Sequence, residues 1–391
     1  MNRLIIEGTP SLAPLRLAEK IERREVRKNM NMISSALRLN RAQEERLATA
    51  LKDGAKPAIL LFRILGPQLQ SLFAEMVNLK DTPHLLLHGN PHLDNYARTY
   101  NGTGLVDFDR SRIGPSLWDL TRALSSITFW SREEQITPAP EVAKIFFDSY
   151  REAIEDRLAY WETPDFLKQI QPKKFQLSPT RYLNSGKKWV KKMEQNIVEA
   201  PEDFHHILFE TYVKEHEPKL NEHWKLAEVA EVAGSMGKRH YVYQLDPKVT
   251  TREPILLDIK ETYCEEDNEH FYNPFEHQGI RMVTASRLYS PGIEEGIGYC
   301  SLNGEEYWVR QIPVFSVKVP VGLNQDCALQ LARAIGLQLG RGHRVIDEVY
   351  TDAQLKDSLI HVSRDRRDQI IKICRDLNRA VLELFAHYRD G

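Results

Sequence analysis

The feature that most constrains this sequence is a dense group of polar residues between two short apolar runs. The run LLL at residues 85–87 leads into HGNPHLDN, and the turn sequence NGTG is followed by GLVDFDR. Short apolar runs bounded by glycine, asparagine and proline are typical of strands joined by loops. Because core packing alone would not gather so many polar side chains beside such strands, we expect a chemical site here. Its members are His88, Asn90, His92, Asp94, Asn95, Asp107 and Asp109.

The end of this segment has the character of a metal site. Asp107 and Asp109 are two residues apart on a strand pattern, so they are predicted to share one face while Phe108 faces the core. Two carboxylates suit a hard cation such as Mg²⁺. In kinase-like phosphotransferases a loop aspartate is followed five residues later by a metal-binding asparagine, and then by a strand that ends in a metal-binding aspartate. Asn95 and Asp107 match the last two positions, whereas the first is Asn90, which cannot accept a proton.

Two other interpretations of the segment stay open at this point. Asparagine and aspartate next to glycine often form turns by bonding their own backbone. His84, His88 and His92 are spaced by four and could be metal ligands. Gly89 and Pro91 argue against one helix face that carries all three.

A second candidate site lies late in the chain. The stretch VAGSMGKRHYVYQL places Gly234, Ser235 and Gly237 before an expected strand, and PILLDIKE places Lys260 at the end of the next one. Kinases arrange a phosphate-covering turn and a phosphate-pairing lysine on successive strands in this way. A Walker loop would need serine or threonine where Arg239 stands, and a dinucleotide fingerprint would open a helix. The alternative for Lys260 is a solvated lysine at a strand end.

The spacing of apolar and polar residues divides the chain into four parts. Residues 1–80 have apolar positions at helical spacing, and residues 81–230 continue from the polar segment into helical patterns that end in HWKLAEVAEV. Residues 231–322 are strand-rich, with HYVYQL, PILLDIKE, GIGYCSL and EYWVRQIPVF as expected antiparallel strands. Helices return over residues 323–391. The expected fold class is α+β, with a helix-rich lobe and a small antiparallel sheet.

Composition limits the partners and the compartment. Lysine and arginine total 53 against 55 acidic residues, so no global charge favours a nucleic acid or a membrane surface. No CxxC pair and no apolar run of about 20 residues is present. We therefore expect a cytoplasmic protein that contacts no membrane. A basic stretch at residues 168–192 could contact nucleic acid, but a solvated helix face is the favoured interpretation and nucleic acid is not an expected partner.

Six segments stand out together, namely HGNPHLDN, LVDFDR, GPSLWDLTRAL, VAGSMGKRHYVYQL, LLDIKE and YWVRQIPV. In content and order they resemble the motifs of the uncharacterised bacterial domain-of-unknown-function 2252 family, over residues 62–387. The resemblance implies a protein-kinase-like, two-lobed fold related to aminoglycoside phosphotransferases, with ATP and Mg²⁺ as cofactors. Because the loop and the metal strand precede the glycine sheet, the lobe order would be circularly permuted, which is permissible when the original termini lie close together.

The resemblance also implies roles for matching residues. Asn95 and Asp107 would bind Mg²⁺. The nucleotide would be held by Gly234, Ser235, Gly237, Lys260 and Arg310, and the catalytic positions would be His88, Asn90, His92 and Asp109. Behind the loop, a helix would carry Asp119 and Arg122 as a buried ion pair, and His343 matches a helical histidine whose role is open.

Two departures from the family pattern affect the expected chemistry. Asn90 stands where the family has aspartate, which is unfavourable for base-assisted transfer. Thr284 stands where a helix glutamate would pair with Lys260. Possible substitutes for that glutamate are Glu265, Glu266, Glu269 and Glu276.

These features define three functional hypotheses. The first is an ATP- and Mg²⁺-dependent kinase or nucleotidyl transferase that acts on a small molecule or a protein. The second is a nucleotide-binding pseudokinase that works through a partner, because Asn90 lacks a proton-accepting group. The third is a metal-dependent phosphohydrolase that uses His88, His92, Asp107 and Asp109, which leaves Lys260 unexplained.

Overall fold

The computed structural model describes residues 37, 39, 41–52, 57–132, 135–185, 203–232, 238–344 and 350–390. The chain forms two compact units, Met1–Met76 with Arg379–Gly391, and Val77–Asn378. In its described part the first unit is helical, with a core that includes Leu61, Phe62 and Leu69. Its helices are α2 (Arg41–Lys52), α3 (Pro57–Ile64), α4 (Gly66–Met76) and the end of α15 (Arg367–Asp390).

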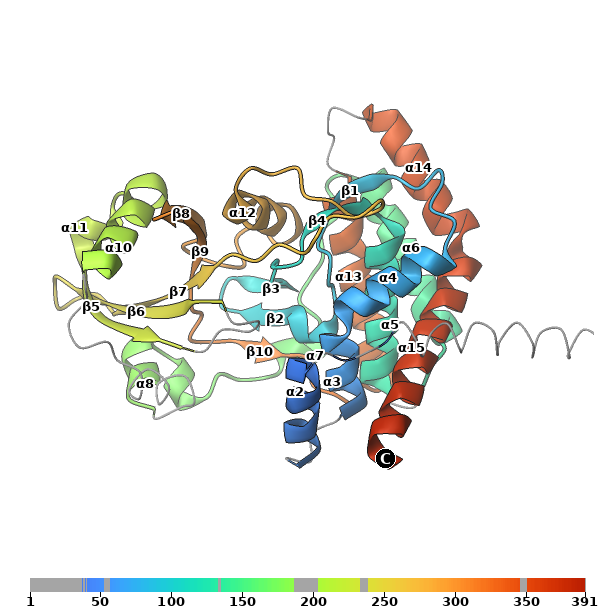
Figure 1. Cartoon of the computed structure of the whole chain (residues 1–391), viewed down its shortest axis with the longest axis horizontal. Helices are drawn as coiled ribbons and strands as arrows, with labels where there is room; N and C mark the ends of the chain where they lie inside the picture. The colour runs from blue at the N-terminus through green and yellow to red at the C-terminus, as the bar shows by residue number, and fades with distance from the viewer. Residues whose placement is uncertain are drawn as a thin grey trace, which may run out of the picture. The chain divides into compact units, whose positions relative to one another are not determined.

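The second unit contains a five-stranded antiparallel sheet with the strand order β5-β6-β7-β9-β8 (Figure 1). One helix, α12 (Gln278–Tyr289), follows the third strand in chain order and precedes the last two. The expected strands HYVYQL, PILLDIKE and GIGYCSL are confirmed, whereas EYWVRQIPVF is a strand only as far as Gln311. Pro313 lacks the backbone N–H that a continuing strand would need. The strands are β5 (Trp224–Glu231), β6 (His240–Pro247), β7 (Ile255–Glu261), β8 (Gly298–Leu302) and β9 (Glu305–Gln311).

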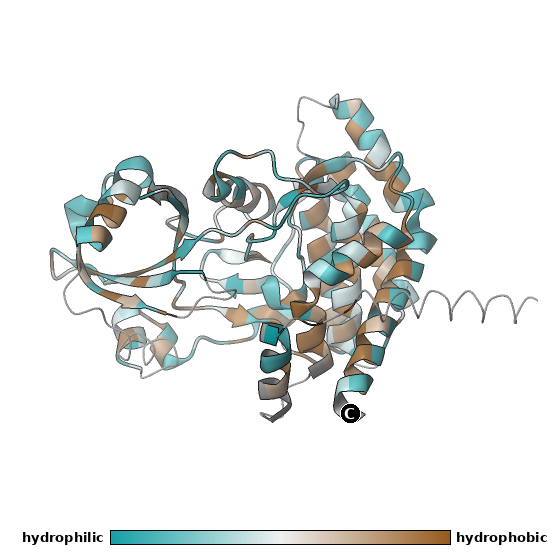
Figure 2. Cartoon of the chain, viewed as in Figure 1, coloured by the Kyte–Doolittle hydropathy of each residue, from teal (hydrophilic) through white to brown (hydrophobic). Residues whose placement is uncertain are grey.

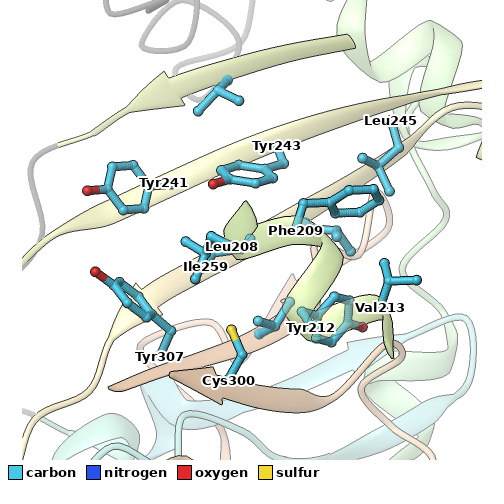
Figure 3. Close-up of a cluster of buried hydrophobic side chains, with 13 residues drawn as sticks. Leu208, Phe209, Tyr212, Val213, Tyr241, Tyr243, Leu245, Ile259, Cys300 and Tyr307 are labelled. Atoms are coloured by element: carbon cyan, nitrogen blue, oxygen red, sulfur yellow. The ribbon is translucent and has the colours of Figure 1, made fainter. Parts of the chain in front are cut away.

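The two faces of this sheet differ in character because neighbouring residues of a strand point to opposite faces. On β7, Leu257 and Ile259 pack into an apolar cluster with α10 (Asp203–His216), which Figure 3 shows. Asp258 and Lys260 alternate with them and therefore lie on the opposite face. On that face β7 pairs Asp258 with Arg310 of β9, so the sheet presents charges away from α10.

The first strand of the sheet corrects the sequence-based expectation of helix for HWKLAEVAEV. Residues Trp224–Glu231 form β5 and pair with β6, with a register shift between Leu226 and Glu228. Leucine, alanine and glutamate favour helix locally, but pairing with β6 and burial of Val229 and Ala230 override that preference. The sheet therefore begins before residue 231, the expected boundary.

Small strands carry the early polar segment. β1 (His84–Leu87) pairs with β4 (Arg112–Pro115), and β2 (Tyr96–Thr99) pairs with both β3 (Gly102–Leu105) and β10 (Val317–Lys318). All these pairs are antiparallel. The polar loops thus lie at strand ends, as the sequence predicted.

Helices support these strands, and Figure 2 shows hydrophobic residues along them. Helices α13 and α6 pack closely, because a Cβ at Gly336 or Gly340 of α13 would collide with the carbonyl oxygens of Phe146 and Tyr150. No helix in the described ranges is long and apolar enough to span a membrane. The remaining elements are η1 (Leu93–Asn95), α5 (Leu117–Ser131), α6 (Pro140–Glu155), α7 (Asp165–Lys168), η2 (Lys174–Gln176), α8 (Pro179–Leu183), α11 (Leu220–His223), α13 (Gln325–His343) and α14 (Asp352–Asp365).

Candidate active site

Residues in the first turn of α5 form hydrogen bonds with the loop between β1 and η1. The backbone N–H groups of His88 and Gly89 donate to the carboxylate of Asp119 at 2.8 and 3.0 Å. The indole of Trp118 donates to the Gly89 carbonyl at 2.7 Å. Gly89 has a φ of 82°, and a Cβ there would collide with the Arg110 carbonyl. The loop conformation therefore requires glycine.

Asp119 also contacts His343, the helical histidine whose role the sequence left open. His343 Nε2 lies 3.4 Å from Asp119 Oδ2, and its Nδ1 lies 2.8 Å from the hydroxyl of Tyr150. All three side chains are fully buried. This chain of polar groups joins α13 and α6 to the loop, a support that the sequence located but did not explain.

Asn90 is hydrogen-bonded through its side chain to α5 and through its backbone to the rest of the loop. Its Oδ1 accepts from Nε of Arg122 at 3.0 Å, and its backbone carbonyl accepts from Nδ2 of Asn95 at 3.2 Å. Arg122 is buried behind the loop, as expected. In place of the expected ion pair with Asp119, its guanidinium binds Asn90, while Asp119 accepts from the backbone of His88 and Gly89. Through these bonds Asn90 helps to orient the loop. Its side chain is an amide and has no basic site that could accept a proton.

The two loop histidines are packed rather than exposed. The ring of His88 is fully buried, with its centroid 4.8 Å from that of Phe108 and 5.9 Å from that of Tyr289. Burial lowers the pKa of His88, so its imidazole is neutral at pH 7. His92 is 4% exposed and stacks on Trp130. These positions favour loop support over proton transfer for both residues.

The hairpin of β2 and β3 brings Asn95 and Asp107 to the same end. Tyr96 pairs with Leu105, and the backbone N–H of Val106 donates to the Asn95 carbonyl at 2.7 Å. Because Nδ2 of Asn95 donates to Asn90, its Oδ1 is the atom of that amide able to bind a cation. Two oxygen donors at one hairpin end fit the predicted metal ligands.

Asp107 does not continue the strand, which corrects the expectation of a regular strand through GLVDF. β3 ends at Leu105, and Asp107 has a φ of 71°, a conformation that costs energy for a residue other than glycine. Phe108 is fully buried, as predicted. The backbone bend thus buries the phenylalanine and directs the two flanking aspartates into the site.

The two aspartates have opposite electrostatic environments. Burial would raise the pKa of Asp107, but Lys260, Arg310 and Lys318 outweigh it and lower the pKa. Burial, followed by the neighbouring Asp107 carboxylate, raises the pKa of Asp109 to about 6. Asp107 is therefore the ionised partner of the basic groups, and Asp109 binds protons more readily.

The five-stranded sheet supplies two of those basic groups, Lys260 on β7 and Arg310 on β9. Lys260 and Arg310 both face Asp258, with N–O distances of 3.6 and 3.1 Å. Both cations also lie over the ring of Trp308, at 5.9 and 5.4 Å from its centroid. Such contacts hold the two cations on one sheet face.

The acidic partner of Lys260 was missed by the sequence analysis, which considered only glutamates. Asp258 lies two residues before Lys260 on the same strand, so the spacing DIK already placed both side chains on one face. Glu265 instead pairs with Arg110 and Arg112, at 3.2 and 3.5 Å. Glu266, Glu269 and Glu276 are exposed.

The aspartate loop and the sheet face meet in one site. Lys260 and Arg310 are close enough to Asp107 and Asp109 for their charges to shift the pKa values of both carboxyls. The described residues contain no group of three or more histidine, cysteine, aspartate and glutamate side chains arranged to hold a metal. A cation would therefore be shared between Asn95, Asp107 and oxygens of a bound ligand. Gly234, Ser235 and Gly237 lie outside the described residues.

Comparison with known families places this site in a class. Residues 12–161, which contain the Asn90 loop and both aspartates, match the phosphotransferase enzyme family. The chain thus has a kinase-like region of the phosphotransferase type. Residues 174–390 match the DUF2252 family, described as uncharacterized proteins conserved in bacteria.

The second match covers more than half of the chain, so the protein belongs to the DUF2252 family. The match begins at residue 174, later than residue 62, where the motif resemblance was expected to begin. The early motifs HGNPHLDN and LVDFDR fall instead within the phosphotransferase match. No curated protein and no solved structure matches the chain.

Proposed function

We propose that the protein is an ATP- and Mg²⁺-dependent phosphotransferase. The observation that carries this proposal is the meeting of two sheet cations, Lys260 and Arg310, with the carboxylates of Asp107 and Asp109. A nucleoside triphosphate needs cations that bind its phosphate oxygens and a metal that neutralises the negative charge of the transferring phosphoryl group. Both kinds of charge converge here from elements far apart in the sequence.

Each group has a role that follows from its chemistry. Lys260 and Arg310 would bind phosphate oxygens, with Asp258 and Trp308 holding both cations in place. Asn95 and Asp107 would hold Mg²⁺, which supplies charge neutralisation when bound. Gly234, Ser235 and Gly237, which lie between β5 and β6 in the sequence, would cover the phosphates, as the family resemblance implies.

Proton transfer from the acceptor is assigned to Asp109 rather than to Asn90. The Asn90 amide is occupied with Arg122 and cannot take a proton. Asp109 is a carboxyl beside the metal-binding position. Loss of a general base costs roughly 10²- to 10⁴-fold, so a substitute carboxylate has a large effect on the rate. The acceptor would be a small molecule or a protein.

We also propose that the lobe order is circularly permuted relative to kinases. The lysine lies on the third strand of the sheet in chain order, and a helix and two more strands follow, as expected for the nucleotide lobe. The phosphotransferase match, which contains the catalytic-loop-like and metal motifs, lies before this sheet in the chain. This order supports a permuted arrangement.

A second candidate is a pseudokinase that binds nucleotide without transferring phosphate, and the Asn90–Arg122 hydrogen bond favours it. Nucleotide binding is common to both candidates, whereas phosphate transfer separates them. Metal-dependent hydrolysis by His88, His92, Asp107 and Asp109 gains no support, because both histidines are buried in packing contacts.

Calorimetric titration with ATP, with and without Mg²⁺, tests the proposal. The unchanged chain should bind ATP more tightly with Mg²⁺. Lys260→Ala should weaken binding in both conditions, because it removes a phosphate-binding cation. Asp107→Ala should abolish the Mg²⁺ enhancement. Lys225→Ala, which removes an exposed lysine of β5 in the same sheet, is the matched control and should change nothing. Absence of ATP binding by the unchanged chain would refute the nucleotide site.

A further inference from the structure

Arg281 of α12 is a buried cation that forms hydrogen bonds with the segment after Asp107. Its side chain is 2% exposed, and Nη1 and Nη2 donate to the Asp109 carbonyl at 3.1 and 3.2 Å. Nη1 also donates to the carbonyl and to the Oγ of Ser111. A buried charge is costly unless it is well hydrogen-bonded, so these bonds fix both the arginine and the backbone that it holds.

The guanidinium is itself oriented from two sides. Its Nε donates to Oε1 of Gln278 at 2.9 Å, and its Nη2 donates to the Tyr263 carbonyl at 2.8 Å. Gln278 lies at the start of α12, and Tyr263 follows β7, the strand that carries Lys260. Arg281 therefore joins three segments, namely α12, the chain after the lysine strand and the aspartate loop.

The opposite end of α12 reaches the strands that lead into both loops. The hydroxyl of Tyr289 donates to the Leu86 carbonyl at 2.9 Å, just before the Asn90 loop. Ser290, which follows the helix, donates to the Leu105 carbonyl, just before Asp107. The helix therefore contacts the backbone on both sides of the aspartate pair.

We propose that Arg281 is a positioning residue, which sets the place of Asp107 and Asp109 and so links α12 to the metal. The proposal rests on the proposed Mg²⁺–ATP site. The link expected from kinases is a helix glutamate that pairs with the strand lysine, but α12 has Thr284 there and Lys260 pairs with Asp258. The connection of this helix to the site therefore runs through the backbone of the aspartate loop.

The test is calorimetric titration of ATP, with Mg²⁺ and with a chelator, for Arg281→Gln, Arg281→Lys and the unchanged chain. Arg287→Gln on the same helix is the matched control, because Arg287 is exposed. Removing the support of a metal ligand typically costs 10- to 100-fold in metal affinity. Arg281→Gln should therefore weaken Mg²⁺–ATP binding by about 10- to 100-fold and leave the affinity for metal-free ATP unchanged.

Arg281→Lys should fall between Arg281→Gln and the unchanged chain, because an ammonium cannot reproduce the planar donor set of arginine. If circular dichroism shows that Arg281→Gln does not fold, the comparison of Arg281→Lys with the unchanged chain tests the role of Arg281, and a loss of affinity confined to Mg²⁺–ATP is the expected result. Equal losses with and without Mg²⁺, or no loss, would overturn the role of Arg281 while the proposed function stands. If the unchanged chain shows no Mg²⁺-enhanced ATP binding, both proposals fail.

Discussion

At the scale of single residues, Asn90 and Arg122 decide how the loop can work. The arginine is fully buried and donates to the Asn90 amide. An aspartate at position 90 would keep the same shape and add a charge-assisted bond to this guanidinium. The loop is therefore built to accept a carboxylate at the position where this chain has an amide.

Asn90→Asp should raise the rate of phosphate transfer to water or to an acceptor by up to about 10²-fold, because it adds a proton acceptor at the loop position to the one that Asp109 supplies. Release of ADP from Mg²⁺–ATP measures this rate. Asn303→Asp in the exposed turn between β8 and β9 is the control and should have no effect. An unchanged rate with intact ATP binding would favour the pseudokinase candidate.

Some residues of the site could be predicted from the sequence, and others could not. The sequence was sufficient to predict that Asn95 and Asp107 lie close together, because the hairpin that joins them is local in sequence. Asp258 was missed although it lies two residues from Lys260, because the kinase pattern directed attention to a glutamate on a helix. The contact of Arg281 with Asp109 joins distant parts of the chain, and no local pattern predicts such a contact.

At the scale of elements, strands with alternating residues were predictable and β5 was not. The run HYVYQL alternates and contains residues that favour strands, whereas LAEVAE favours helix until it pairs with β6. The bend at Asp107 was also unpredictable, because a positive φ at aspartate is imposed by surrounding structure. The sequence therefore predicted the number of sheet strands after residue 231 but not where the sheet begins.

The packing of α13 on α6 gives a prediction at this scale. Glycine-to-alanine substitution inside a helix ordinarily stabilises it by up to about 1 kcal/mol. At Gly340 the new Cβ would collide with the Tyr150 carbonyl, so Gly340→Ala should instead lower the free energy of unfolding by about 1 to 3 kcal/mol. Urea denaturation measures the change. A stabilised variant would show that the two helices are not in close contact.

At the scale of the whole molecule, the unit Val77–Asn378 contains both the sheet cations and the aspartate loop. A ligand that bridges them binds only the folded chain and therefore stabilises it. The stabilisation is a property of the complete site, since the sheet cations would bind the phosphates and the aspartate loop would bind the metal.

Mg²⁺–ATP at 100 times its dissociation constant should raise the free energy of unfolding by about 2.7 kcal/mol. Removing the metal with a chelator should reverse most of this increase, because Asp107 would then repel the phosphates. Thermal and urea unfolding under the two conditions measure the difference. Equal stabilisation with and without the metal would contradict a role for Asn95 and Asp107 in metal binding.

A crystal structure with Mg²⁺ and a non-hydrolysable ATP analogue would test the proposed nucleotide site by direct observation. We expect phosphate oxygens in contact with Lys260 and Arg310, and one metal ion bound by Asn95, Asp107 and the phosphates. A nucleotide bound elsewhere, with Lys260 still paired only with Asp258, would contradict it.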